Sequence, residues 1–168
     1  MDKGKTITQI CVVVEDVHKV NANWARVLGE PLAEIVTIFP EGIYHYTHGK
    51  AVDYRDCQVA KYELDGFILE LIQPGETASP WRTFLERHGQ GVFHFCIFVD
   101  DRKVFQQTLS EIGVGFPYHV GYFPGGSYQY VDARDALGLE LSVNHHGDNS
   151  ALIEDILQGR SLPLDELN

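Results

Sequence analysis

Two apolar segments far apart in the chain share one pattern, with a single polar side chain near the middle of each. Residues 7–17 read ITQICVVVEDV and residues 91–101 read GVFHFCIFVDD, so that Gln9 falls on His94 when Ile7 is laid on Val92. Runs rich in β-branched and aromatic residues predict buried strands. A pattern that occurs twice predicts a chain built from two copies of one unit.

The same series of elements follows each of these strands. In the first half, helical spacing of Val17, Val20, Trp24, Val27 and Leu28 predicts a helix capped by Glu15 or Asp16 and ended by Gly29. Strands are predicted in the first half at 34–39, 57–64 and 65–74, with a hairpin at Asp65-Gly66. The second half gives a strand at 91–99, a helix at 102–112 and strands at 116–120, 127–132 and 137–143. The order is β-α-β-β-β in both.

Several segments fall outside this minimal repeat. Ser79-Pro80 predicts the start of a short linker helix, and ALIEDILQ predicts an amphipathic C-terminal helix. Residues 39–56 and the glycine-rich 121–127 are predicted to be loops, and loops of this kind are often functional lids. We therefore expect a first module at 1–75, a linker helix at 76–90, a second module at 91–146 and a C-terminal helix and tail at 147–168.

Composition limits the possible partners. The formal net charge of −11 argues against nucleic acid, which binds to basic faces. No apolar run approaches the ~20 residues of a membrane span, and MDKGKT lacks the pattern of a signal peptide. We expect a cytoplasmic protein with no membrane partner. The three cysteines, Cys11, Cys57 and Cys96, form no CxxC motif, and the first and last are expected to be small apolar residues inside strands.

Four polar residues in apolar strands indicate a common site. Glu70 and Glu140 each lie between two leucines, so the glutamates face away from the side that the leucines bury. If the polar faces of the strands meet, these glutamates converge with Gln9 and His94. Two buried carboxylates without a counter-charge are costly, and a divalent cation removes that cost. The oxygen and nitrogen donors suit Zn, Ni, Co, Mn or Fe(II).

The duplicated unit with these four positions resembles the vicinal oxygen chelate superfamily, which includes glyoxalase I, methylmalonyl-CoA epimerase, extradiol dioxygenases and metal-free antibiotic-resistance proteins. The resemblance covers residues 6–144 and implies an α+β fold, in which two tandem βαβββ modules form a curved mixed sheet around a metal cleft. It also implies that one metal ion per site is held by the first and last strands of each module, at Gln9, Glu70, His94 and Glu140. The segment ASPWRTFLERHGQGVFHFCIFVDD is similar to methylmalonyl-CoA epimerases, whereas the set Gln, Glu, His, Glu is similar to glyoxalase I.

The resemblance implies proton removal next to a carbonyl group through an enolate. We expect a metal-dependent epimerase or isomerase in which Glu140 is the base and Glu70 the second proton station. The strand 57–64 has Cys57, Gln58 and Val59 where some epimerases place a catalytic glutamate, which argues against their known pair of bases. The substrate is expected to be a small carbonyl compound such as a CoA or glutathione thioester, with a homodimer as the assembly.

Three other functions remain open. The first is a glyoxalase I-like lyase that acts on a hemithioacetal of glutathione. The second is a ring-cleaving dioxygenase, although such enzymes prefer two histidines and one glutamate around Fe(II). The third is a small-molecule-binding resistance protein without catalysis. Basic residues that could bind an anionic substrate are Lys50, Arg55, Arg82, Arg87 and Arg134, although each is more simply a surface charge.

Overall fold

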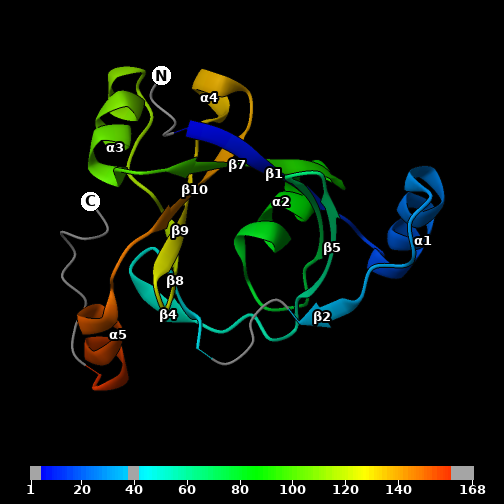
Figure 1. Cartoon of the computed structure of the whole chain (residues 1–168), viewed down its shortest axis with the longest axis horizontal. Coiled ribbons are helices and arrows are strands. Elements are labelled where there is room, and N and C mark those ends of the chain that lie inside the picture. The colour runs from blue at the N-terminus through cyan, green and yellow to red at the C-terminus, as the bar shows by residue number, and fades with distance from the viewer. Residues whose placement is uncertain (1–4, 38–41, 160–168) are drawn as a thin grey trace. The chain divides into compact units, whose positions relative to one another are not determined.

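The computed structural model describes residues 5–37 and 42–159. Within these ranges the elements are β1 (Lys5–Val13), α1 (Val17–Leu28), β2 (Ile35–Thr37), β3 (Tyr44–Thr47), β4 (Lys50–Val52), β5 (Gln58–Leu64), β6 (Phe67–Gln73), α2 (Pro80–His88), β7 (Gly91–Val99), α3 (Arg102–Glu111), β8 (His119–Phe123), β9 (Gly126–Val131), α4 (Arg134–Leu137), β10 (Glu140–His146) and α5 (Ser150–Leu157) (Figure 1). The predicted α+β class and the repeated β-α-β-β-β order are confirmed, with β3 and β4 inserted into the first copy.

The chain forms two compact units that do not follow the sequence halves. The first unit contains the described parts of residues 8–40 and 54–95, and the second contains those of residues 1–7, 41–53 and 96–168. Because compactness divides the chain differently from the sequence repeat, the module boundaries proposed from the repeat stay a prediction.

In the first unit the strand order is β2-β5-β6-β1-β7. β1 pairs with β6 in parallel, whereas β5 pairs antiparallel with both β2 and β6. The sheet is therefore mixed, as predicted. Helix α1 contacts β5 and β6 and covers one face of this sheet.

The ends of the predicted elements follow local chemistry. The Asp16 carboxylate accepts a hydrogen bond from the Lys19 backbone N–H at 2.9 Å and so caps α1, which ends at Gly29 with φ 71°. Ser79 caps α2 with Pro80 in its first turn. Asp65 and Gly66, at φ 39° and 84°, make the predicted tight turn between β5 and β6.

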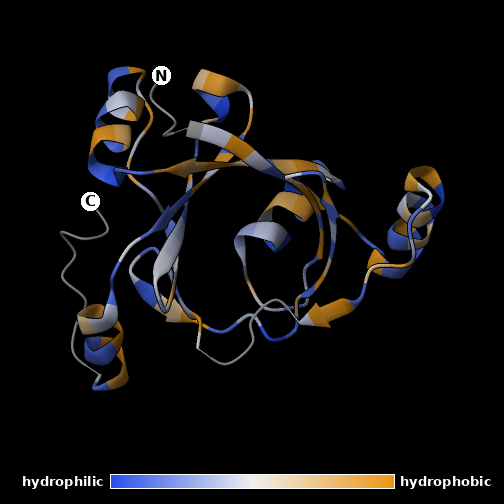
Figure 2. Cartoon of the chain, viewed as in Figure 1, coloured by the Kyte–Doolittle hydropathy of each residue, from blue (hydrophilic) through white to orange (hydrophobic). Residues whose placement is uncertain are grey.

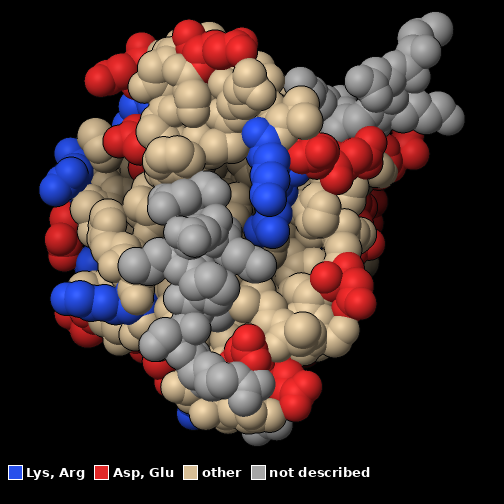
Figure 3. Space-filling model, turned by 90° about the vertical axis from the view of Figure 1, so that its left-hand side faces the viewer, with Lys and Arg blue, Asp and Glu red and all other residues tan. Residues whose placement is uncertain are grey.

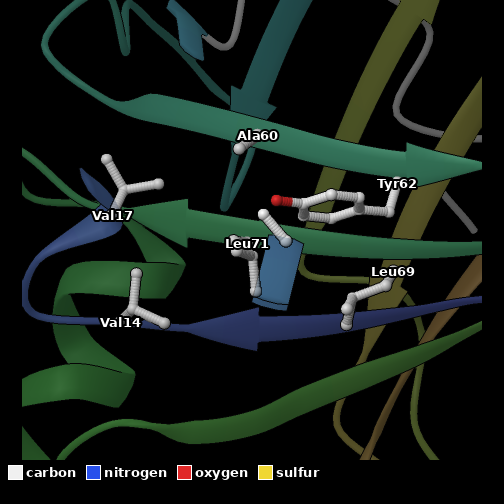
Figure 4. Close-up of a cluster of buried hydrophobic side chains, with 7 residues drawn as sticks. Val14, Val17, Ala60, Tyr62, Leu69 and Leu71 are labelled. Atoms are coloured by element: carbon white, nitrogen blue, oxygen red, sulfur yellow. The ribbon is translucent and has the colours of Figure 1, made fainter. Parts of the chain in front are cut away.

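The core of the first unit lies between α1 and the sheet. Figure 4 shows the strand residues Ala60, Tyr62, Leu69 and Leu71 pointing into a cluster with Val14 and Val17. The Tyr62 hydroxyl donates a hydrogen bond to the Asn21 backbone oxygen at 2.9 Å, so this buried polar group is satisfied. Val27, expected on the same helical stripe, is 74% exposed, because the buried face of α1 runs through Val17, Asn21 and Ala25 instead.

In the second unit the strand order is β10-β9-β8-β3-β4, and all its pairs are antiparallel. In Figure 1 the yellow strands β8 and β9 run side by side. Figure 2 shows hydrophobic and hydrophilic residues on both α3 and α5, and α5 confirms the predicted C-terminal amphipathic helix. Whether α5 docks on another surface stays a prediction.

Both predicted loops contain strands that the sequence analysis did not predict there. Residues 44–52 form the β3–β4 hairpin, in which Tyr44, Tyr46 and Thr47 have the residue types of a strand and pair with β8. Residues 121–127 belong mainly to β8 and β9, which leaves only Pro124 and Gly125 in the turn. Residues 39–41 of the first predicted lid lie outside the described part.

The last strand of the second half begins later than predicted. Its expected start at Leu137 is instead the end of α4, which stops at Gly138 with φ 82°. β10 then begins at Glu140. The Glu-Leu pattern therefore predicts the strand correctly, whereas the residues from Leu137 to Leu139 precede it.

Leu71 tests the core of the first unit. Leu71→Ala removes a fully buried side chain at the centre of this cluster and should lower the free energy of unfolding by about 2–5 kcal/mol. Urea unfolding measures this loss. Leu32→Ala is the matched control, because Leu32 is 65% exposed and its truncation should change stability by less than about 0.5 kcal/mol. Equal losses in both variants would contradict the packing described here.

Candidate metal centre

The parallel pair of β1 and β6 brings Gln9 and Glu70 together. Cys11 lies opposite Glu70 in the register, and the Gln9 side-chain amide donates a hydrogen bond to the Glu70 carboxylate at 2.7 Å (Nε2 to Oε2). Leu69 and Leu71 point into the core on the other face of β6. The sequence-based prediction that Glu70 faces away from its neighbouring leucines is therefore correct.

Glu70 also has a basic partner across the β5–β6 hairpin. Lys61 is its register neighbour, and the Lys61 ammonium lies 3.0 Å from the carboxylate (Nζ to Oε1). The Lys61 side chain is 51% exposed, so it reaches this carboxylate from solvent. The expectation that the buried glutamates lack a counter-charge is wrong for Glu70, and the case for a metal depends on the donor atoms instead.

Three possible ligands gather in the first unit. Cys11, Glu70 and His94 are all buried, and one ligand atom from each lies within 4.8 Å of the others. The pKa of His94 falls to about 4, chiefly because burial disfavours the charged ring and despite the opposing Glu70 charge. A neutral imidazole has a lone pair available for a metal. The set fits a divalent transition metal through one nitrogen, one oxygen and one sulfur donor.

Sequence reasoning missed Cys11 as part of this group. Its place in an apolar strand predicts only a small apolar residue. Burial and the Glu70 charge raise the pKa of the Cys11 thiol well above its usual range, which agrees with an unreactive thiol when no cation is near. The available signal was strand alternation, since Cys11 follows Gln9 by two positions and so shares its face.

The second unit contains the remaining predicted ligand, Glu140. The Tyr118 hydroxyl donates a hydrogen bond to its Oε2, and the Arg134 guanidinium lies 3.4 Å from its Oε1. Burial raises the pKa of Glu140, while Tyr118 and Arg134 oppose that rise. Glu140 thus also has a counter-charge. The convergence of Glu140 with Gln9, Glu70 and His94 stays a prediction.

One face of the sheet in the second unit is rich in imidazole and hydroxyl groups. Thr47, His119, Tyr130 and Ser142 are successive register neighbours across β3, β8, β9 and β10. The Thr47 hydroxyl is 2.8 Å from Nδ1 of His119. Because strand residues alternate, Ser142 shares its face of β10 with Glu140. The sequence analysis did not single out His119, which lies in the strand expected at 116–120.

A second row of the same face contains His45, Gly121 and Tyr128. The His45 and His119 rings are stacked with centroids 6.0 Å apart, and the Tyr128 hydroxyl is 3.3 Å from Nε2 of His119. A Cβ on Gly121 would lie 2.2 Å from the Tyr128 ring, so the absence of a side chain lets that ring cross the strand.

The opposite face of this sheet borders a cavity of about 390 Å³. Its lining includes Tyr122, Ser127 and Gln129, which alternate along their strands with the residues of the polar face. The positively charged side chains of Arg102 and Lys103 also line it. The Arg102 guanidinium donates to the Ser127 hydroxyl at 3.0 Å.

Figure 3 shows one face of the protein on which acidic side chains form several separate groups among basic and neutral residues. None of the four predicted metal ligands lines the cavity, so it is not the predicted site.

The candidate basic residues for an anionic substrate have different surroundings. Arg82 is held by the Gly75 backbone oxygen at 2.8 Å and by Glu76 at 2.8 Å, which gives it a structural role. Arg134 contacts Glu140 directly. Lys50, Arg55 and Arg87 are exposed, as expected for surface charges.

Comparison with known families identifies the relatives of this chain. Residues 8–129 match the family model described as the glyoxalase/bleomycin resistance protein/dioxygenase superfamily. The chain belongs to this superfamily. The matched segment includes Gln9, Glu70 and His94 and ends before Glu140. The resemblance inferred from the repeated strands is confirmed.

Individual relatives are distant. An uncharacterized protein of Bacillus subtilis, YqjC, is 26% identical over 103 residues, which cover 58% of this chain and 71% of that protein. The hypothetical protein BH1468 of Bacillus halodurans has a TM-score of 0.60 at 19% identity, with 88% of this chain and 99% of that chain covered. The structural likeness shows a shared fold, and neither comparison gives an activity.

Methylmalonyl-CoA epimerases share the fold. The Mycobacterium tuberculosis enzyme has a TM-score of 0.55 at 15% identity, covering 87% of this chain and 91% of that chain. A variant of the Streptomyces coelicolor enzyme, in complex with 2-nitronate-propionyl-CoA, has a TM-score of 0.58 at 14% identity, covering 86% of this chain and 96% of that chain.

Among the described helices of the present chain, none has the length and hydropathy needed to cross a membrane.

His45 gives a pH-dependent prediction. Burial lowers its pKa to about 4, with Asp53 opposing the shift, so the unfolded state binds a proton more readily than the folded state. The contribution of His45 to stability is fully present above pH 6.5, the pKa of the unfolded state, and is lost as the pH falls from there toward 4. His45→Phe keeps a ring and removes the titration. Between pH 7.5 and 5 it should lose about 2 kcal/mol less stability than wild type in urea unfolding.

The exposed His18 provides the control for this measurement. His18→Phe should leave the difference in stability between the two pH values as in wild type. An unchanged difference in His45→Phe would contradict the assignment of this pH dependence to His45.

Proposed function

We propose that the protein is a divalent-metal-dependent isomerase or epimerase that removes a proton next to a carbonyl group, with a CoA thioester as the leading substrate class. The observation that carries this proposal is the buried grouping of Glu70 and His94, from separate strands, with a further donor on β1. Membership of the superfamily and the fold shared with methylmalonyl-CoA epimerases support it. The cytoplasmic location and the homodimer stay predictions.

The residues that would hold the ion are Gln9, Glu70, His94 and Glu140. A divalent ion supplies Lewis acidity at a substrate oxygen and so favours loss of the neighbouring proton. Gln9 fixes one oxygen of Glu70 by its 2.7 Å hydrogen bond. His94 is neutral near pH 7 because of its lowered pKa. The Glu70 oxygen is thus oriented and the His94 ring is uncharged before substrate binds.

Glu140 is the proposed base. A carboxylate whose pKa is raised by burial accepts a proton more readily than one in water. The Tyr118 hydroxyl and the Arg134 guanidinium each contact one of its two oxygens and so fix the orientation of the carboxylate. Glu70 is the proposed second proton station. The polar face that carries His119, Tyr128 and Ser142 shares its sheet with Glu140 and is the proposed contact surface for the substrate.

A glyoxalase I-like lyase is the second candidate. The residue types at the four predicted ligand positions favour it, because they are glutamine, glutamate, histidine and glutamate. The chemistry of the base would be the same, since a hemithioacetal also loses a proton next to a carbonyl group. The two candidates are separated by comparing turnover of methylmalonyl-CoA with turnover of the hemithioacetal of glutathione and methylglyoxal.

A small-molecule-binding protein without a metal is favoured by a different observation. Lys61 and Arg134 each lie beside a predicted glutamate ligand, so these carboxylates are partly compensated by the chain itself. A ring-cleaving dioxygenase has no comparable support from the described residues, because only one histidine takes part in the buried ligand group.

Metal content separates the enzyme from the metal-free binder. Protein purified without added metal should contain about one divalent ion per chain, and His94→Ala should lose it because a buried ligand is removed. His18→Ala, which changes an exposed histidine, should retain the ion. Elemental analysis measures the content. A wild-type protein that contains no divalent ion and takes up none of Zn, Co, Ni or Mn would favour the binding protein.

Proton exchange tests the role of Glu140. Glu140→Gln should slow exchange of the substrate α-proton in D₂O by about 10²–10⁴-fold, because the amide cannot accept the proton. Most of the bound metal should remain. NMR of methylmalonyl-CoA during incubation follows the exchange. Glu63→Gln is the control, since Glu63 is an exposed carboxylate on β5. Equal exchange in Glu140→Gln and wild type would remove Glu140 from the reaction.

A further inference from the structure

Cys11 lies closer to the predicted ligands than its residue type in an apolar strand suggests. It is fully buried, and it lies opposite Glu70 in the parallel register of β1 and β6. Its sulfur, a Glu70 oxygen and a His94 nitrogen all lie within 4.8 Å of one another. Three different elements, β1, β6 and β7, thus bring three donor atoms to one buried point.

These separations suit a shared ion. In a tetrahedral zinc site a sulfur at about 2.3 Å and a nitrogen at about 2.0 Å from the metal lie ~3.5 Å apart. The three donors therefore need side-chain shifts on the order of 1 Å to surround one ion.

Gln9 has a different part in this arrangement. Its side-chain N–H donates the 2.7 Å hydrogen bond to Glu70 and so orients that ligand, while its side-chain oxygen takes no part in this bond. Cys11, two positions further along the same face of β1, presents a softer donor atom to the same carboxylate neighbourhood.

We propose that Cys11 is a further ligand of the proposed ion, so that its sulfur joins the Glu70 oxygen and the His94 nitrogen among the donors. The proposal rests on the proposed function, because it requires that the site take a metal. On binding, the Cys11 S–H bond is replaced by a sulfur–metal bond and the proton leaves to solvent. A thiolate favours zinc or cobalt over manganese or magnesium, which prefer oxygen donors.

Cobalt(II) provides the direct test, because a thiolate ligand gives it a charge-transfer absorption in the near ultraviolet. Metal-free, full-length protein is titrated with CoCl₂ while its absorption spectrum is recorded. Wild type should show the near-ultraviolet band together with the visible bands of bound cobalt. Cys11→Ser should lose the near-ultraviolet band and retain visible bands. Cys57→Ser, which changes a buried cysteine of the same unit that is not in the group, should keep both.

A second variant keeps the test decisive if Cys11→Ser does not fold. The double variant Cys57→Ser, Cys96→Ser has Cys11 as its sole thiol, so a near-ultraviolet band in this protein identifies the ligand without altering it. A spectrum with visible bands and no charge-transfer band would overturn the proposal for Cys11 and leave the metal-dependent function intact. Failure of the wild-type protein to bind cobalt at all would overturn both.

Metal preference gives an independent readout. If Cys11 binds the ion, Cys11→Ser should lose about tenfold or more in Zn²⁺ affinity and change much less in Mn²⁺ affinity. Competition with a chromogenic chelator measures both affinities, and circular dichroism confirms that the variant is folded. An equal loss for the two ions would indicate that the substitution disturbs the site in general, which contradicts a specific thiolate contact.

Discussion

The parallel pairing of β1 with β6 is the constraint on which the candidate site depends. This register sets Cys11 opposite Glu70 and brings Gln9 within 2.7 Å of the same carboxylate. A shift of one residue would turn Glu70 toward the core and Leu71 away from it, because side chains alternate along a strand. The packing of Leu69 and Leu71 against α1 and β5 therefore fixes the position of Glu70 as well as the stability of the unit.

The two buried glutamates, Glu70 and Glu140, have different partners. Glu70 has an ammonium partner that reaches it from solvent and accepts a hydrogen bond from the Gln9 amide, with Cys11 opposite it on the neighbouring strand. Glu140 has a tyrosine hydroxyl and a guanidinium, and burial raises its pKa. Equivalent positions in a repeated sequence have thus acquired different surroundings.

The superfamily supplies a scaffold on which metal-dependent enzymes and metal-free binders both occur. A fold shared at 14–19% identity with methylmalonyl-CoA epimerases and with a protein of unknown activity does not select between them. The choice depends on the atoms around Glu70. Lys61 compensates the charge of Glu70 within the chain, whereas Cys11 and His94 place two further donor atoms near the same carboxylate.

The sequence by itself determined the repeated β-α-β-β-β order, the helix ends at Asp16, Gly29 and Ser79, and the strand faces that carry Gln9, Glu70, His94 and Glu140. These features follow from local periodicity, capping and turn chemistry, which act over a few residues. Only the tertiary structure decided that residues 44–52 join β8, that Lys61 and Arg134 pair with the glutamates, and that Cys11 lies beside Glu70 and His94. Such contacts depend on the register between strands distant in sequence, and no local pattern specifies that register.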